Sequence, residues 1–149
     1  MLWWQNLPFF SIMLCIFSAA VCAVLPRRAA RLWAPSVTGA ILVMSVLLAA
    51  HVRSSGSFVF TMGHFTAPWG NEIRAGLLEA VTACVFFAVM LLSVIAGGEH
   101  LSEDIMPDKQ SLYAVTLCLT GASLLVMIYT NDLFTAYVFL EIMTLGACS

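Results

Sequence analysis

Five long apolar segments constrain the fold of this chain more than any other feature. Only short polar stretches separate them, and they cover residues 7–25, 34–52, 75–97, 112–130 and 133–149. A helix needs about 20 apolar residues to cross the hydrocarbon core of a bilayer. Backbone groups in lipid must be paired within their own segment, which favours helices. The pattern predicts an all-α membrane protein with five transmembrane helices, the fifth ending at the C-terminus.

Composition supports the same class and excludes several others. Hydrophobic residues make up 62% of the chain and charged residues 9%, whereas soluble domains carry about 25% charged residues. The net charge of -2 gives no basic surface for nucleic acid. Glycine-rich nucleotide loops, haem histidine pairs and iron–sulfur cysteine patterns are absent from the sequence, so we expect no cofactor. An acidic stretch fits no metal-ligand spacing and is interpreted as a solvated loop; it contains Glu99, His100, Glu103, Asp104 and Asp108.

The loops predict how the chain is oriented within a single transmembrane domain, residues 1–149. Arg27, Arg28 and Arg31 lie between the first two apolar segments. Positively charged short loops usually face the cytoplasm, so we expect the N-terminus to lie outside. The second loop, residues 53–74, is then external. Its run FVFTM, followed by Gly-His and a second short run, predicts a small β-hairpin between helices 2 and 3.

One acidic residue lies deep in an apolar segment. Glu141 follows Leu133 by eight residues, which places it roughly 12 Å along the fifth helix. An ionised carboxylate near the bilayer centre costs about 2.5–3.5 kcal/mol on the most lenient scale, and such residues usually serve transport. We therefore predict that Glu141 transfers protons. The alternative is a protonated Glu141 that is hydrogen-bonded within the helix bundle.

Two further acidic residues are candidates for an accessory role. Asp132 immediately precedes the fifth helix, and an aspartate at this position often caps a helix. Glu79 lies about one turn into the third helix. Its side chain is long enough to reach the external interface, which is the simpler explanation for its presence. No catalytic residue is predicted.

Two stretches resemble the antiporter-like membrane subunits. This family is shared by Mrp-type cation/proton antiporters, respiratory complex I and membrane-bound hydrogenases. The stretch FTMGHFTAPWGNEIRAGLLEAVTA resembles the family's junction between the hairpin and the third helix, and TNDLFTAYVFLEIMTLGA resembles its fifth helix. The matching residues of the second stretch are Asp132, Leu133, Phe134, Tyr137, Val138, Phe139, Glu141 and Ile142.

The first stretch gives the resemblance a more specific direction. Ala67-Pro68-Trp69-Gly70, followed by Glu72 and Arg74, resembles the Mrp D subunit and its hydrogenase relatives in particular. The chain departs from the family at two nearby positions. Gly76 stands where the family often has an aspartate, and Glu79 stands where it has a small residue.

The resemblance implies a function and a set of partners. In the family, the glutamate of the fifth helix, here Glu141, conducts protons and pairs with a lysine on the seventh helix. Family subunits have about fourteen helices, so the resemblance implies a split or truncated N-terminal part of a larger subunit. A partner chain is then expected to supply the remaining helices and the lysine. The other expected partners are the lipid bilayer, further membrane subunits, and protons, either alone or coupled to sodium ions.

Three hypotheses follow. In the first, the chain belongs to a multi-subunit cation/proton-translocating complex of the Mrp antiporter type, in a bacterial or archaeal cell membrane. In the second, it belongs to a redox-driven ion-pumping complex, either complex I-like or a membrane-bound hydrogenase, and is not catalytic alone. In the third, it is a purely structural membrane subunit in which Glu141 is a neutral packing residue.

Overall fold

The computed structural model describes residues 6–61, 72–98, 106 and 109–148. Within these ranges it contains five helices and two strands. The helices are α1 (Leu7–Val24), α2 (Arg27–Ser55), α3 (Leu77–Gly98), α5 (Gln110–Tyr129) and α6 (Leu133–Cys148), and the strands are β1 (Phe58–Thr61) and β2 (Glu72–Ala75). The protein is therefore an all-α membrane protein with a small two-stranded sheet, as the sequence predicts.

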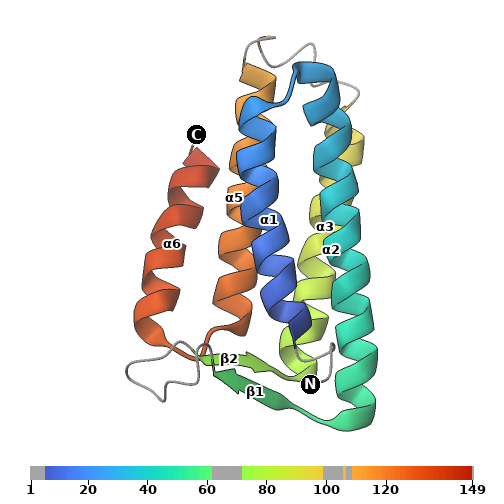
Figure 1. Ribbon diagram of the computed structural model, residues 1–149, viewed down its shortest axis with the longest axis vertical. Coiled ribbons are helices and arrows are strands. Elements are labelled where there is room, and N and C mark those ends of the chain that lie inside the picture. Colours follow the sequence, from blue (N-terminus) through green and yellow to red (C-terminus); the bar gives the residue numbers. More distant parts are fainter. Residues whose placement is uncertain (1–5, 62–71, 99–105, 107–108, 149) are drawn as a thin grey trace.

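Four helices form a bundle, and the fifth lies against one side of it. Helices α1, α2, α3 and α5 run side by side, and α6 packs along α5 at the edge of the bundle (Figure 1). The four bundle helices are each long and apolar enough to cross a membrane. Helix α6 is also apolar but has 16 residues, about 24 Å at the rise of an α-helix.

Small residues allow the bundle helices to approach one another closely. On α5 the buried positions include Ala114, Cys118, Gly121 and Ala122. A side-chain carbon at Gly121 would lie 3.3 Å from the Met90 side chain, so α3 and α5 are close at this level. Lipid tails are as apolar as the helix surfaces, so close packing of this kind, rather than hydrophobic burial, stabilises the bundle.

The start of α2 differs from the sequence prediction. The apolar pattern predicts a helix from residue 34, with the arginines in the preceding loop. The observed helix begins at Arg27, which places Pro35 inside it. Pro26 directly precedes the helix with extended backbone dihedrals, and arginine is a good helix former. The connection between α1 and α2 is therefore shorter than predicted, and the arginines belong to the first turns of α2.

A two-stranded sheet is present between α2 and α3, as predicted, whereas the predicted turn at Gly63-His64 lies outside the described residues. Strands β1 and β2 pair in antiparallel fashion, with Phe58 opposite Ala75 and Thr61 opposite Glu72. The hairpin lies at the same end of the bundle as the start of α1 and the turn between α5 and α6 (Figure 1). This arrangement agrees with helices that alternate in direction, whereas the external position of this end stays a prediction.

Candidate functional site

Glu141 lies halfway along α6 and faces away from the bundle. It is the ninth of the helix's 16 residues, and its side chain is exposed. None of the α6 residues is buried in this chain. The helices of this chain therefore do not enclose the Glu141 carboxyl group, and the alternative of a hydrogen-bonded, neutral Glu141 stays a hypothesis. In a bilayer, the surface of α6 that carries this carboxyl group faces either lipid or another protein segment.

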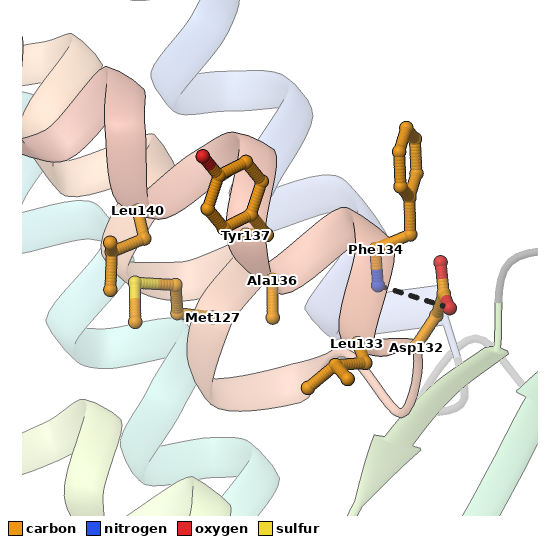
Figure 2. Close-up of a pocket in the computed structure, with 7 residues that line it drawn as sticks. All are labelled: Met127, Asp132, Leu133, Phe134, Ala136, Tyr137 and Leu140. Atoms are coloured by element: carbon orange, nitrogen blue, oxygen red, sulfur yellow. Dashed lines mark hydrogen bonds between the residues drawn. The ribbon is translucent and has the colours of Figure 1, made fainter.

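A tyrosine and an apolar groove adjoin Glu141. Tyr137 precedes Glu141 by one helical turn, and its hydroxyl group interacts with the Glu141 carboxyl group. The tyrosine ring also lines an open groove of about 760 Å³ between α5 and α6 (Figure 2). The other residues that line this groove are Met127, Asp132, Leu133, Phe134, Ala136 and Leu140.

Asp132 caps α6, as the sequence predicts. Its carboxyl oxygens accept hydrogen bonds from the backbone N–H groups of Phe134 at 3.4 Å and Thr135 at 3.1 Å. The Thr135 hydroxyl group donates a further bond of 2.8 Å. The bond from this hydroxyl, followed by the backbone bonds, holds the pKa of Asp132 below its usual value. The carboxylate therefore stays ionised at the helix N-terminus, where the helix dipole also favours negative charge.

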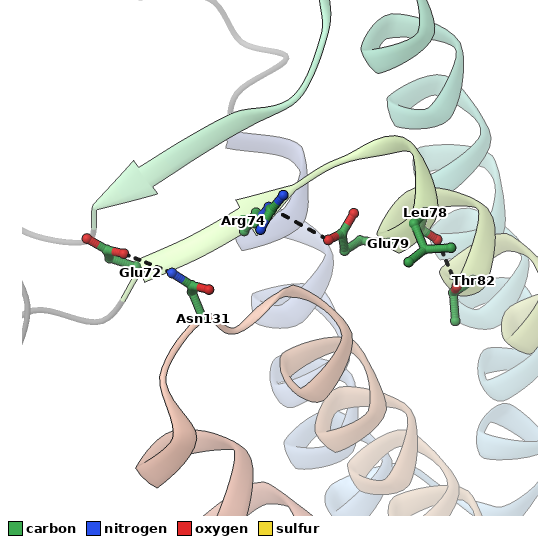
Figure 3. A network of polar contacts seen from close by, with 6 residues as sticks. All are labelled: Glu72, Arg74, Leu78, Glu79, Thr82 and Asn131. Carbon is green, nitrogen blue, oxygen red and sulfur yellow. Dashed lines mark hydrogen bonds and ion pairs between the residues drawn. The ribbon is translucent and has the colours of Figure 1, made fainter.

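Glu79 lies at the hairpin end of the bundle, and its interfacial position stays a prediction. Its carboxylate is 3.9 Å from the guanidinium group of Arg74 (Figure 3). Arg74 is more than half exposed, so the pair contributes little to stability. The Glu79 carboxylate occupies the space that a side chain at Gly76 would need. The two departures from the family pattern are thus coupled in space.

The hairpin is also bonded to the turn that leads into α6. The Asn131 side-chain amide donates a 3.1 Å hydrogen bond to the Glu72 carboxylate (Figure 3). The backbone N–H of Asn131 donates a second bond, of 2.9 Å, to the Glu72 carbonyl. Ile73 and Thr130 form an isolated antiparallel bridge beside them. A role for Asn131 was not predictable from the sequence, because these partners are 59 positions apart and no spacing pattern links them.

A second polar region lies at the opposite end of the bundle. The Arg31 guanidinium group donates a hydrogen bond to the backbone carbonyl of Gly98, joining α2 to the end of α3. The Trp33 indole donates a 2.9 Å bond to the Ser18 hydroxyl group, which lies 3.5 Å from the Cys118 sulfur. These contacts link α1, α2 and α5, and they involve none of the predicted site residues.

The predicted site residues thus occupy two levels of the structure. Asp132 and Glu79 lie near the hairpin, and Glu141 is nine positions further along α6 than Asp132, about 13 Å at the helical rise. The acidic stretch with Glu99, His100, Glu103, Asp104 and Asp108 lies outside the described residues, as do residues 67–70. Elsewhere in the described ranges, no three histidine, cysteine, aspartate or glutamate side chains gather as metal ligands would.

Comparison with known proteins gives one informative similarity. No protein-family model matches the chain. The sequence is 30% identical, over 148 residues, to NADH-quinone oxidoreductase subunit N of Desulforudis audaxviator (strain MP104C). The match covers 95% of this chain and 29% of that protein, so the chain spans less than a third of its relative's length. The chain is thus similar to the antiporter-like membrane subunits in the broad sense, which includes respiratory complex subunits.

Proposed function

We propose that this chain is part of an ion-translocating membrane complex and that Glu141 transfers protons within it. The observation that carries the proposal is the position of Glu141, on the exposed face of an apolar helix in which no residue is buried. A carboxylate that faces hydrocarbon is costly, and such groups generally line a wet cavity or meet a charged partner. The similarity to a subunit of NADH-quinone oxidoreductase supports membership of a multi-subunit complex.

The proposed partner of α6 is a further transmembrane helix that carries a basic side chain. The groove beside Tyr137 is apolar apart from Asp132, so an apolar helix fits there. A lysine on that helix would stabilise the ionised form of Glu141, whereas the surrounding hydrocarbon favours the protonated form. These opposing influences allow the carboxyl group to bind and release a proton. The helix belongs to this polypeptide or to a partner chain that continues the subunit.

Asp132 and Glu79 have accessory roles in this proposal. Asp132 lines the groove and caps α6, the helix that carries Glu141. The cap stabilises the first turn of this helix. Glu79 and Arg74 place a pair of charges at the hairpin end of the bundle. This end is external in the proposed orientation, in a bacterial or archaeal cell membrane. The Glu79 carboxylate there is accessible to protons from that side.

The energy source distinguishes two versions of the function. In the first, a gradient-driven antiporter of the Mrp type exchanges protons with sodium ions; the resemblance of residues 67–74 to the Mrp D subunit supports it. In the second, electron transfer in partner subunits drives the pump. The name of the similar protein, a subunit of an NADH-quinone oxidoreductase, supports the second version. Glu141 has the same role in both.

Replacement of Glu141 in the assembled complex tests the proposal. Glu141→Gln keeps the size and polarity of the side chain but cannot bind and release a proton at physiological pH. We expect proton translocation by membrane vesicles that contain the complex to fall by about 100-fold or more, the usual range for loss of an acid–base group. Assembly, measured by co-purification of the other subunits, should be unchanged.

Thr144→Val is the matched control. Thr144 is also exposed on α6, and its hydroxyl group bonds only to the Glu141 carbonyl of its own helix among the contacts described, at 2.8 Å. This variant should translocate protons at the wild-type rate. Wild-type translocation by Glu141→Gln would contradict the proposed role and would leave the structural subunit as the better explanation.

A further inference from the structure

We propose that Glu72 and Asn131 are positioning residues, which hold α6 at the angle that Glu141 needs for proton transfer. The inference rests on the proposed function for its consequence, but the positioning itself can be measured separately. It concerns a contact between the hairpin and the turn before α6, and neither residue touches a transferred proton.

The turn between α5 and α6 is fixed at each of its three residues. Thr130 pairs with Ile73 of β2, and Asn131 makes two hydrogen bonds to Glu72 of the same strand. The backbone N–H of Asp132 donates a 3.2 Å bond to the Thr130 hydroxyl group. The turn therefore lies along the free edge of β2 like a short third strand.

Strand β2 is itself firmly attached to the bundle. Ile73 and Ala75 are buried, and β1 covers the other edge of the strand. The next helix, α3, begins two residues after β2 ends. The bonds from Asn131 to Glu72 thus join α6 to a strand that cannot move without displacing buried side chains.

Apart from its packing along α5 and the contact of Phe139 with the bundle core, helix α6 has few other contacts that hold it. None of its residues is buried, and it packs mainly along α5. A cavity of about 130 Å³ separates it from α1, with Phe139 of α6 on one side and Phe9 and Ile12 of α1 among the residues on the other. Unfilled space of this kind allows a helix to tilt without a clash.

The length of α6 converts a small tilt into a large displacement. Glu141 lies about 13 Å beyond the turn, so a tilt of about 10° about the turn would move its carboxyl group by about 2 Å. Proton transfer requires donor and acceptor at hydrogen-bond distance, about 2.6–3.2 Å between heavy atoms or through one water. A displacement of this size would interrupt such a contact with a partner side chain.

The test compares three variants of the assembled complex by two measurements. Asn131→Ala and Glu72→Ala each remove the side-chain bond, and the double variant Glu72→Asn with Asn131→Glu restores an amide–carboxylate pair of the same total length. The first measurement is the proton translocation rate. The second is the distance distribution between spin labels on Cys148, the last residue of α6, and on a cysteine introduced at Val24, the exposed last residue of α1.

We expect both single variants to broaden the distance distribution and to lower the translocation rate about fivefold, and the exchanged pair to restore both. Ser54→Ala is the control, because Ser54 is exposed near the same end and its hydroxyl group bonds only to carbonyls of α2 among the contacts described. It should leave both measurements unchanged. An unchanged distribution in Asn131→Ala, or a changed distribution without any loss of rate, would overturn the positioning role.

The outcome separates this inference from the proposed function. If Glu141→Gln pumps normally, proton transfer by Glu141 fails, and the distance distributions still decide whether the pair positions α6. If Glu141→Gln is inactive but the exchanged pair restores neither measurement, Glu141 keeps its role and the positioning pair is refuted.

Discussion

Helices α5 and α6 are neighbours in sequence and in space, and both are apolar, yet α5 is packed inside the bundle and α6 lies at its edge. Nine residues of α5 are buried, and none of α6 is. The buried side of α5 consists mostly of small residues, whereas α6 presents Phe134, Tyr137 and Leu145 on exposed positions. Small residues allow backbones to approach in lipid, so α5 completes the bundle within this chain.

The difference shows which part of the molecule is stabilised by its own contacts. The bundle of α1, α2, α3 and α5 has a continuous core that includes Ile41, Phe87 and Leu125. Helix α6 has no such core, and the one carboxylate deep in the apolar sequence lies on it. The bundle is therefore stabilised within this chain, whereas in the proposed function α6 carries the proton-transfer group and packs against a further helix.

The largest expected effect compares two phenylalanines, one from each region. Phe87 is fully buried in the bundle, and Phe134 is 74% exposed on α6. Phe87→Ala would leave a cavity in the bundle and should destabilise the protein by about 3–5 kcal/mol, the usual range for this truncation of a buried residue. Phe134→Ala should change stability by less than about 0.5 kcal/mol. Unfolding of each variant in mixed detergent micelles would measure the difference, and equal effects would contradict the division into bundle and α6.

Substitutions at two glycines compare the packing inside the bundle with the packing of α6 against it. A side-chain carbon at Gly121 would lie within 3.5 Å of side chains on α1 and α3, and one at Gly146 would meet only α5, at Thr120 and Thr116. Gly121→Val should destabilise the bundle by about 1–3 kcal/mol through overpacking. Gly146→Val should instead displace α6 and leave bundle stability unchanged. Unfolding and the spin-label distance between α1 and α6 distinguish these results, and bundle unfolding in Gly146→Val would count against the comparison.

The cap of α6 should depend on pH in a defined direction. The pKa of Asp132 is lowered in the folded protein. Its contribution is therefore fully present above the usual aspartate pKa and is lost as the pH falls through the folded value. Hydrogen exchange at the Phe134 and Thr135 amides should become faster on acidification, after correction for the intrinsic pH dependence. In Asp132→Asn the side chain does not titrate, so an identical pH response in that variant would refute the explanation.

The smallest expected effect concerns the neighbour of Glu141. Tyr137→Phe keeps the ring in the groove and removes the hydroxyl group that interacts with Glu141. Loss of one modest hydrogen bond, about 0.5 kcal/mol, corresponds to a change of about twofold in the proton translocation rate. A loss as large as that of Glu141→Gln would mean that Tyr137 itself carries the proton.

The features that the sequence predicts are those with a local physical cause. Bilayer thickness sets the length of the apolar segments, and the three-residue spacing from Asp132 to Thr135 sets the cap of α6. The predicted start of α2 was wrong. The apolar pattern ends at the arginines, but the extended backbone of Pro26 and the helix propensity of arginine allow the helix to begin at Arg27. The bond between Glu72 and Asn131 depends on how the hairpin folds back onto the bundle, which no single segment specifies.

The sequence likewise does not predict which face of α6 is exposed. Sequence depth predicts that Glu141 lies among apolar residues, but it does not say whether the side chain points inward or outward. The orientation follows from which side of α6 packs against α5, and Gly146, which leaves no space for a side chain beside Thr120, lies on that side. The position of Glu141 along the helix was therefore predictable, and the face on which it lies was not.

Direct observation of the proton on Glu141 tests the central claim. Infrared difference spectra of the working complex should contain a carboxyl band that appears and disappears with turnover and that is absent in Glu141→Gln. The proposed proton transfer predicts this band. A spectrum in which the Glu141 carboxyl group keeps one protonation state throughout turnover, while the complex pumps at its normal rate, would contradict it.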